Sequence, residues 1–379
     1  MDADIGLGVI GCGGFGLFAL QQFTQTPGIR LAGMAGTARP AALAAAKRFG
    51  LEDVESIDRL VARPEVDLVY IATPPFLHFE QARQALEAGK HVICEKPLAL
   101  TVEQADELIT LARKRDRLLV ANLMQRYNPL FAIVGQLVER KLLGELLHGY
   151  FENYASDENL PADHWFWDAA KGGGIFIEHG VHFFDLFAGW LGAGEVVAAH
   201  ARSRANTTIE DQVQCTVRYR DGILVNFYHG FTQAGRMDRQ ELRLIFERGD
   251  LLLHGWVPTY ARLHGIADES GMRELCDLFP GARVDALAAY GPKDRHCAGH
   301  GNEYDVFQKF EMHWGEGQEK SRLYCELLRY FMADQVAWIR NHAHVRKTTE
   351  RNGRDSVALA CAADRLANHN ASTSVAIKV

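Results

Sequence analysis

The 379-residue chain is predicted to fold in two parts, an α/β part built on a doubly wound parallel sheet and an α+β part with an open, mainly antiparallel sheet. Up to about residue 122, short apolar runs alternate with helical patterns at the spacing of βαβ units. Beyond that point strands follow one another, and Asp221-Gly222 predicts a tight hairpin turn. We therefore expect one domain over residues 1–122 and a second over residues 123–379.

The first predicted strand, Ile5–Ile10, ends in a glycine cluster that is followed by a helical pattern through Phe23. Strand, G-x-G-x-x-G and helix in this order are typical of a dinucleotide-binding turn. Gly11 allows the tight bend, Gly13 lets the backbone approach a pyrophosphate, and Gly16 lets helix and strand pack closely. The N–H groups at the helix start attract the phosphates. The residues expected to bind a cofactor here are Gly11, Gly13, Gly14, Phe15 and Gly16.

Further strands of the same sheet are predicted at Leu31–Ala35, Leu68–Ala72, Val92–Cys94 and Leu118–Ala121. Ligands of such sheets bind at the carboxyl ends of the strands. Thr73-Pro74 and Glu95-Lys96-Pro97 each directly follow a strand, so both are expected beside the cofactor. Lys96 could there donate a hydrogen bond to a substrate oxygen, or it could be an ordinary solvated lysine.

The residues after the second strand indicate which cofactor is used. An acid is expected about 20 residues after the glycines if the ribose 2′-hydroxyl of NAD is bound, but the chain reads A-G-T-A-R-P over residues 35–40. Thr37 could donate a hydrogen bond to a 2′-phosphate, and Arg39 could pair with it through two. Alternatively, Thr37 only caps the next helix and Arg39 is solvated. We expect NADP, with NAD as the alternative.

Residues 172–185, G-G-G-I-F-I-E-H-G-V-H-F-F-D, carry the most informative pattern of the chain. Glu178, His182 and Asp185 stand at spacings i, i+4 and i+7, so they share one face of a predicted helix inside an otherwise apolar run. Charge on such a helix needs a partner or a function. Together with the glycine turn and Lys96, this face suggests hydride transfer to or from a carbon–oxygen bond.

The second part is read more coarsely. Strands are expected at 148–155, 196–205, 213–219, 223–229, 242–246 and 251–254, helices at 322–341 and 355–367, and a last strand at 375–379. Residues 256–320 fit this pattern poorly, and an insertion of that length is expected to be a lid, an oligomer contact or a partly mobile loop. Trp165 lies in an aromatic run that either stacks on a sugar-like face or anchors the loop in the core.

Composition excludes several classes of partner. The formal net charge of −7 comes without a block of like charges, which argues against nucleic acid. No apolar run reaches the ~18 residues of a membrane span, and the acidic residues 1–4 predict no signal peptide. Seven cysteines without a C-x-x-C pair indicate reduced thiols and a cytoplasmic protein. His296, Cys297, His300 and His313 match no common zinc spacing, so no metal is expected.

Taken together, these motifs resemble the glucose–fructose oxidoreductase, inositol dehydrogenase and rhizopine-catabolism (Gfo/Idh/MocA) family. The resemblance runs from about residue 8 to residue 260 and resumes over the C-terminal helices. It is carried by the glycine turn, Thr73-Pro74 with His78, the run A-G-K-H-V-I-C-E-K-P over residues 88–97, R-Y-N-P over residues 126–129, and the triple-glycine helix. It implies an N-terminal Rossmann domain, a nicotinamide cofactor, and a C-terminal sheet through which subunits often pair, so we expect a homo-oligomer.

The resemblance also suggests roles for single residues. Lys96 and His182 correspond to the family's catalytic lysine and histidine, and Glu178 stands where the family has Asp. A side chain one methylene longer could still orient His182 or a hydroxyl, but a reactive geometry good to about 1 Å is easily missed. Further cofactor contacts are expected at Thr73, Pro74, His78, Glu95 and Lys96, and substrate contacts at Lys96, Arg126, Trp165, Glu178, His182 and Asp185.

The leading hypothesis is reversible oxidation of a secondary alcohol in a sugar, cyclitol or similar polyhydroxylated molecule, with His182 taking or returning the hydroxyl proton, aided by Lys96 and steered by Glu178. Asp185 binds a second hydroxyl or only supports His182. Three alternatives stay open. They are a reductase of a larger carbonyl or imine, a glycosidase that keeps its nicotinamide bound, and a non-catalytic dinucleotide-binding sensor or scaffold.

Overall fold

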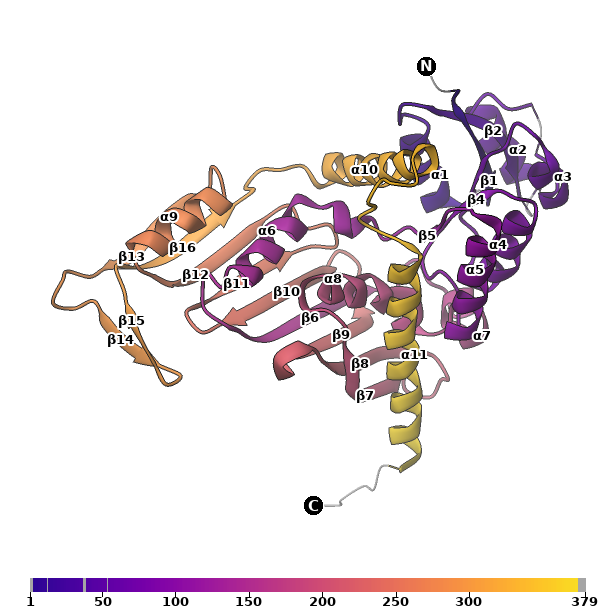
Figure 1. The fold of residues 1–379 in the computed structure, drawn as a ribbon. Helices are drawn as coiled ribbons and strands as arrows, with labels where there is room; N and C mark the ends of the chain where they lie inside the picture. Colours follow the sequence, from indigo (N-terminus) through magenta and orange to yellow (C-terminus); the bar gives the residue numbers. More distant parts are fainter. Residues whose placement is uncertain (1–2, 12, 37–38, 53, 374–379) are drawn as a thin grey trace. The chain divides into compact units, whose positions relative to one another are not determined.

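The computed structural model describes residues 3–11, 13–36, 39–52 and 54–373, with the side chains of residues 39, 41 and 370–373 left out. Its contacts divide the chain into two compact units. The first unit comprises Met1–Tyr127, Ala162–Asp185 and Tyr324–Asp364, and the second comprises Asn128–Pro161, Leu186–Leu323 and Arg365–Val379. The first unit therefore joins the N-terminal sheet to two later segments of the chain (Figure 1).

A five-stranded parallel sheet forms the centre of the first unit, in the order β2-β1-β3-β4-β5. The strands are β1 (Ile5–Ile10), β2 (Ile29–Ala35), β3 (Leu68–Ile71), β4 (His91–Cys94) and β5 (Leu119–Ala121). Helices α1 (Gly14–Phe23), α2 (Arg39–Arg48), α3 (Ile57–Ala62), α4 (His78–Glu87) and α5 (Val102–Arg115) connect or flank them. The strands are short and apolar because both faces of such a sheet are covered.

Next to β2, Glu55 makes an isolated parallel bridge with Ala35. The order is thus that of a doubly wound Rossmann sheet, 3-2-1-4-5-6, whose third strand is reduced to one residue. The direction of winding changes between β1 and β3, and ligands of these sheets bind at that point, outside the carboxyl ends of the strands. The predicted doubly wound parallel sheet is confirmed.

Two later helices of the first unit pack against α1 and β5. In α10 (Lys320–Arg340), the Tyr324 ring lies 5.4 Å from the Phe18 ring of α1. α11 (Glu350–Thr373) approaches β5 so closely that a Cβ on Gly353 would lie 3.0 Å from the Cβ of Ala121. Both helices were expected, and α11 begins five residues earlier than the sequence pattern suggested.

The second unit is built on a nine-stranded sheet in the order β13-β16-β12-β11-β10-β6-β9-β8-β7. Its predicted strands are β6 (Leu146–Ser156), β7 (Glu195–Ser203), β8 (Glu210–Arg218), β9 (Leu224–Gln233), β10 (Arg239–Phe246) and β11 (Gly249–His254). Only the β6–β9 pair is parallel, and the β8–β9 hairpin turns at Asp221-Gly222 as predicted. Along β8 and β9 every second residue is buried because one face of the sheet carries the core, where the ring of Phe227 lies 5.1 Å from that of Phe187. Helix α6 (Pro129–Glu139) belongs to the same unit.

Residues 256–320 form regular secondary structure and not the partly mobile loop that was one of the three expectations, whereas a lid or an oligomer contact stays a prediction. They add β12 (Ala261–Ala267), β13 (Arg283–Ala289) and β16 (Gln308–Trp314) to the sheet, with α9 (Glu269–Leu278). A separate hairpin of β14 (His296–Gly299) and β15 (Asn302–Asp305), orange in Figure 1, stands apart from the sheet. The predicted last strand, 375–379, lies outside the described residues. Within the described part of the chain, no helix is both long and apolar enough to cross a bilayer.

Candidate functional site

The glycine turn between β1 and α1 is shaped by steric constraints. Gly11 has φ +106°, and a Cβ there would lie 2.4 Å from the main-chain oxygen of Ala72. At Gly16 a Cβ would lie 2.6 Å from the Cβ of Ala72, so only glycine permits this approach of helix to strand. At Gly13 and Gly14, in contrast, a Cβ would meet nothing within 4 Å. The turn therefore packs against β3 on one side and leaves the N-terminus of α1 open on the other, as binding of a pyrophosphate requires.

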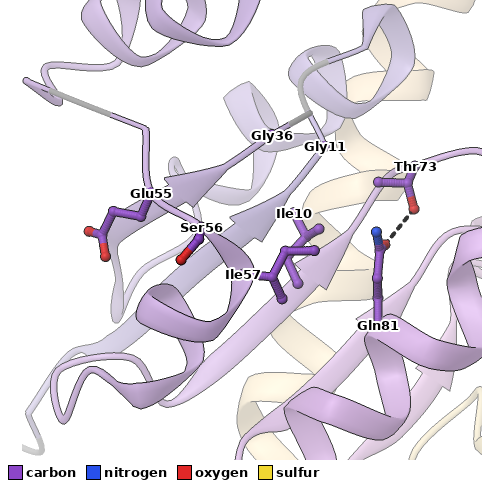
Figure 2. A pocket seen from close by; sticks show the side chains of 8 residues that line it. All are labelled: Ile10, Gly11, Gly36, Glu55, Ser56, Ile57, Thr73 and Gln81. Atoms are coloured by element: carbon purple, nitrogen blue, oxygen red, sulfur yellow. Dashed lines mark hydrogen bonds between the residues drawn. The ribbon is translucent and has the colours of Figure 1, made fainter. Parts of the chain in front are cut away.

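A cavity of about 200 Å³ lies at the carboxyl ends of β1, β2 and β3 (Figure 2). It is lined by Ile10, Gly11, Gly36, Glu55, Ser56, Ile57, Thr73 and Gln81. The Thr73 hydroxyl donates to Oε1 of Gln81 at 2.6 Å, which fixes the amide so that its NH₂ group remains available as a donor. Glu55 forms an ion pair with Arg63. A cavity with one apolar wall and a few fixed polar groups suits a planar base or a ribose.

Ser56, Ile57 and Gln81 were not predicted as site residues. Ser56 caps α3 by accepting a hydrogen bond from the N–H of Arg59 at 3.3 Å. A Ser before a helical run is a recognisable start signal. The residues around Ser56, however, carry no sequence signal that this helix start lies beside the end of β1. Thr37 lies outside the described residues, and of Arg39 only the backbone is described.

Lys96 lies on the turn after β4, and its ammonium group contacts Glu178. Nζ donates to Oε1 of Glu178 and, at 2.9 Å, to the main-chain oxygen of the same residue. Both side chains are mostly buried, with 19% and 14% of their surface exposed. The structure thus brings together two of the three residues predicted to be catalytic, which are 82 positions apart in the sequence.

Glu178 reaches Lys96 from a π-helical turn, Phe176–Gly180, that precedes α8 (Val181–Leu191). Just before it, Gly173 and Gly174 have φ +80° and +84°, so the chain bends there in a conformation that favours glycine. A π-helical turn inserts an extra residue and commonly occurs at functional sites. The predicted helix is therefore regular only from Val181 on, and Glu178 lies in its irregular start.

Arg126 and Asp185 form a buried ion pair. The guanidinium donates to both carboxylate oxygens, at 2.7 and 2.8 Å, and to the main-chain oxygen of Asp185 at 2.7 Å. Asn352 of α11 donates to the same carboxylate at 3.0 Å. Asp185 is 3% exposed. Both residues were predicted to contact substrate; the structure shows them bonded to each other, and a substrate contact stays a prediction.

The other predicted site residues have distinct surroundings. His182 is 5% exposed in the first turn of α8. Trp165 is half-buried with its ring 5.1 Å from that of His164. Phe15, at the start of α1, exposes 39% of its surface, and its ring lies 6.0 Å from that of Tyr324.

Glu95, next to Lys96, is buried and hydrogen-bonded. Its Oε1 accepts from the Tyr70 hydroxyl at 2.6 Å and from Nδ2 of Asn122 at 2.8 Å. Burial raises the pKa of Glu95, and the two donors oppose that shift because they favour the carboxylate. Glu95 thus ties the ends of β3, β4 and β5 together below the turn that carries Lys96. Among the described residues, no group of three or more His, Cys, Asp or Glu side chains could hold a metal ion.

Two family models match the chain. Residues 5–123 match the GFO_IDH_MocA oxidoreductase family, NAD-binding Rossmann fold, and residues 131–252 match the GFO/IDH/MocA C-terminal domain. The chain belongs to the Gfo/Idh/MocA family. This is a family of oxidoreductases, and its N-terminal domain has an NAD-binding Rossmann fold. The glycine turn, the residues that line the cavity and Lys96 all lie within residues 5–123.

The chain is also similar to curated proteins and to solved structures. The chain is 32% identical over 205 residues to the 1,5-anhydro-D-fructose reductase of Ensifer adhaerens, which covers 51% of this chain and 59% of that protein. It is 30% identical over 235 residues to the dTDP-3,4-didehydro-2,6-dideoxy-alpha-D-glucose 3-reductase of Actinomadura kijaniata, covering 61% and 69%. A solved levoglucosan dehydrogenase, in complex with NADH and L-sorbose, has a TM-score of 0.75 at 20% identity over 97% of this chain and 98% of its own, which supports the fold. Matches span 40–69% of the length of the first three curated relatives.

Proposed function

We propose that this protein is an NADP-dependent oxidoreductase that interconverts a secondary alcohol and a carbonyl in a sugar, cyclitol or similar polyhydroxylated molecule. The observation that carries the proposal is the ammonium group of Lys96, held by Glu178 at the carboxyl edge of a sheet whose first turn is open to a dinucleotide. Two curated relatives are named as reductases of sugar-like compounds, which supports the proposal.

The residues of the first unit fit a nicotinamide dinucleotide. Gly13 and Gly14 leave space at the N-terminus of α1, where N–H groups and the helix dipole favour a pyrophosphate. The cavity beside Thr73 and Gln81 has the size and polarity for one end of the cofactor. Such a cofactor would supply the hydride donor or acceptor.

The preference for NADP rests on the end of β2. No acid follows Ala35 before the next helix, so the group that usually binds an unphosphorylated ribose is missing. The nearest acid on the cavity, Glu55, already pairs with Arg63. We infer that Thr37 and Arg39 contact a 2′-phosphate.

In the proposed mechanism the chain supplies the proton chemistry and the orientation. Lys96 has three N–H groups, and two of them are used on Glu178, which leaves one directed donor for a substrate oxygen. His182 takes the hydroxyl proton in oxidation and returns it in reduction, as a general base and acid. Glu178 orients the ammonium group. Arg126, through Asp185, fixes the helix that carries His182.

Fluorescence titration with NADPH and NADH tests the first step, after mass spectrometry has shown whether cofactor is carried through purification. Tight NADPH and weak NADH binding supports the proposal, and the reverse overturns the NADP assignment alone. A screen of sugars, cyclitols and their keto forms with the preferred cofactor then identifies the substrate. We expect the purified protein to be a homo-oligomer through the C-terminal sheet.

For the catalytic assignment, Lys96→Met should lower turnover by about 100-fold or more because the directed donor is lost. The control is Lys114→Met, at the exposed end of α5, which should leave turnover unchanged. Near-wild-type turnover of Lys96→Met would remove Lys96 from the mechanism. Absence of any cofactor binding or retained cofactor would remove the oxidoreductase proposal altogether.

A further inference from the structure

His78 was expected among the cofactor-binding residues, but its surroundings point to a different role. The side chain is fully buried at the start of α4. Its Nδ1 lies 2.7 Å from the main-chain oxygen of Pro97, and its Nε2 lies 2.8 Å from the main-chain oxygen of Thr73. Both ring nitrogens thus face the backbone of the protein itself, and the fully buried ring presents no surface to a cofactor.

The two carbonyl groups belong to the two loops on which the proposed chemistry depends. Pro97 directly follows Lys96 on the turn after β4. Thr73 lies on the loop after β3, lines the cavity, and is held from its side chain by Gln81, one turn along α4 from His78. The ring of His78 is therefore placed between the end of the cofactor cavity and the turn that carries Lys96.

The protonation of the His78 ring determines which hydrogen bonds it can donate. Burial lowers the pKa of His78, the nearby charge of Lys96 lowers it further, and the two carbonyl groups and Glu178 oppose this. Carbonyl oxygens accept but cannot donate, so each ring nitrogen that bonds to Pro97 or to Thr73 must carry the proton. The position therefore needs a hydrogen-bond donor.

We infer that His78 is a positioning residue that fixes the Lys96-Pro97 turn against the Thr73 loop, and so holds the ammonium group of Lys96 in place. The inference rests on the proposed function, because Lys96 is catalytic only there. A buried hydrogen bond to the backbone orders a turn that would otherwise be free to shift, and catalytic geometry is sensitive to shifts of about 1 Å.

Two variants separate the donor from the volume of the side chain. His78→Leu fills a similar space without a donor, whereas His78→Gln keeps an N–H donor. The readout is the rate at which limiting acetic anhydride acetylates Lys96 in the full-length protein, measured by peptide mass spectrometry. Lys90 of the same unit, whose Nζ is held by the main-chain oxygen of Arg63 at 2.9 Å, is the internal reference.

We expect His78→Leu to raise the Lys96-to-Lys90 ratio by about fivefold, since one buried hydrogen bond no longer restrains the turn, and His78→Gln to restore most of the wild-type ratio. A folded His78→Leu protein with an unchanged ratio would overturn the inference. So would a His78→Gln protein that is acetylated like the leucine variant. If His78→Leu does not fold, wild-type protein labelled with ¹⁵N-histidine decides: a slowly exchanging ring N–H supports the inference, and rapid exchange overturns it.

The acetylation readout does not need a substrate, so it remains valid if the proposed function fails. Where turnover is measurable, His78→Leu should lower kcat by about tenfold or more while the Kd for NADPH stays within about threefold, because Lys96 and not the cofactor is displaced. A variant that loses cofactor affinity and keeps kcat would show that His78 serves the cofactor, and the inference would be wrong.

Discussion

We predict that His91 makes the stability of the first unit sensitive to acid. It is the first residue of β4 and 9% exposed, and its Nδ1 accepts the N–H of Leu118 at 2.9 Å. Only an unprotonated Nδ1 can accept this bond. Burial lowers the pKa of His91 from 6.5 to about 4, and the positive charges of Arg117 and His342 outweigh Asp67 and Asp116 in the same direction.

The sign and size of the effect follow from linkage. Because the folded-state pKa lies below the unfolded value, the unfolded chain binds more protons between pH 6.5 and 4, and stability falls as the pH falls through this window. At about 1.4 kcal/mol per pKa unit, the full loss is about 3 kcal/mol, of which about 2 kcal/mol is lost by pH 5.

Urea unfolding of wild-type protein and of His91→Gln, at pH 7.5 and pH 5.0, measures this loss. Glutamine keeps an acceptor for Leu118 but does not titrate, so all other titrating groups cancel in the comparison. The wild type should lose about 2 kcal/mol more than the variant between the two pH values. Equal losses in the two proteins would refute the reasoning, because they would mean that His91 does not titrate differently on folding.

Two further predictions concern the site. Arg126→Met should destabilise the protein by about 3–5 kcal/mol, because it leaves the buried Asp185 carboxylate without its counter-charge; thermal unfolding checks this, and the double variant with Asp185→Leu should recover part of the loss. Gly16→Ala should cost about 1–3 kcal/mol and weaken NADPH binding, because its Cβ overlaps that of Ala72. Gly14→Ala, where a Cβ meets nothing within 4 Å, should keep the stability, and calorimetry with NADPH titration compares the two.

The sequence was sufficient for the features that depend on local pattern. β1 begins and ends where predicted, at Ile5 and Ile10, because its apolar run stops at Gly11, whose φ of +106° breaks the extended conformation. The parallel sheet followed from the alternation of strands and helices. The strands within residues 256–320 were not predicted. β12 buries every second residue, but such a short alternating run of low hydrophobicity is easily interpreted as a loop.

The contacts that build the site could not be read in this way. Arg126 and Asp185 are 59 positions apart, and Asn352 reaches Asp185 from another 167 positions away. Helical periodicity places Asp185 on a face but does not say which cation lies opposite it. Local pattern likewise gave no sign that Glu178 lies in a π-helical turn, since that depends on the bend at the preceding glycines.

These long-range contacts determine which polar groups of the candidate site are already paired within the protein. All the described residues proposed for cofactor binding and catalysis belong to the first unit, so their mutual geometry is set within one compact body. Within it, the carboxylates of Glu178 and Asp185 are each paired with a cation. Two N–H groups of Lys96 are fixed by one residue, through its side chain and its backbone, so the direction of the third is defined before any substrate arrives. In the proposed mechanism, a donor fixed in this way would lose little freedom on binding a developing oxyanion, and this would favour the transition state over the ground state.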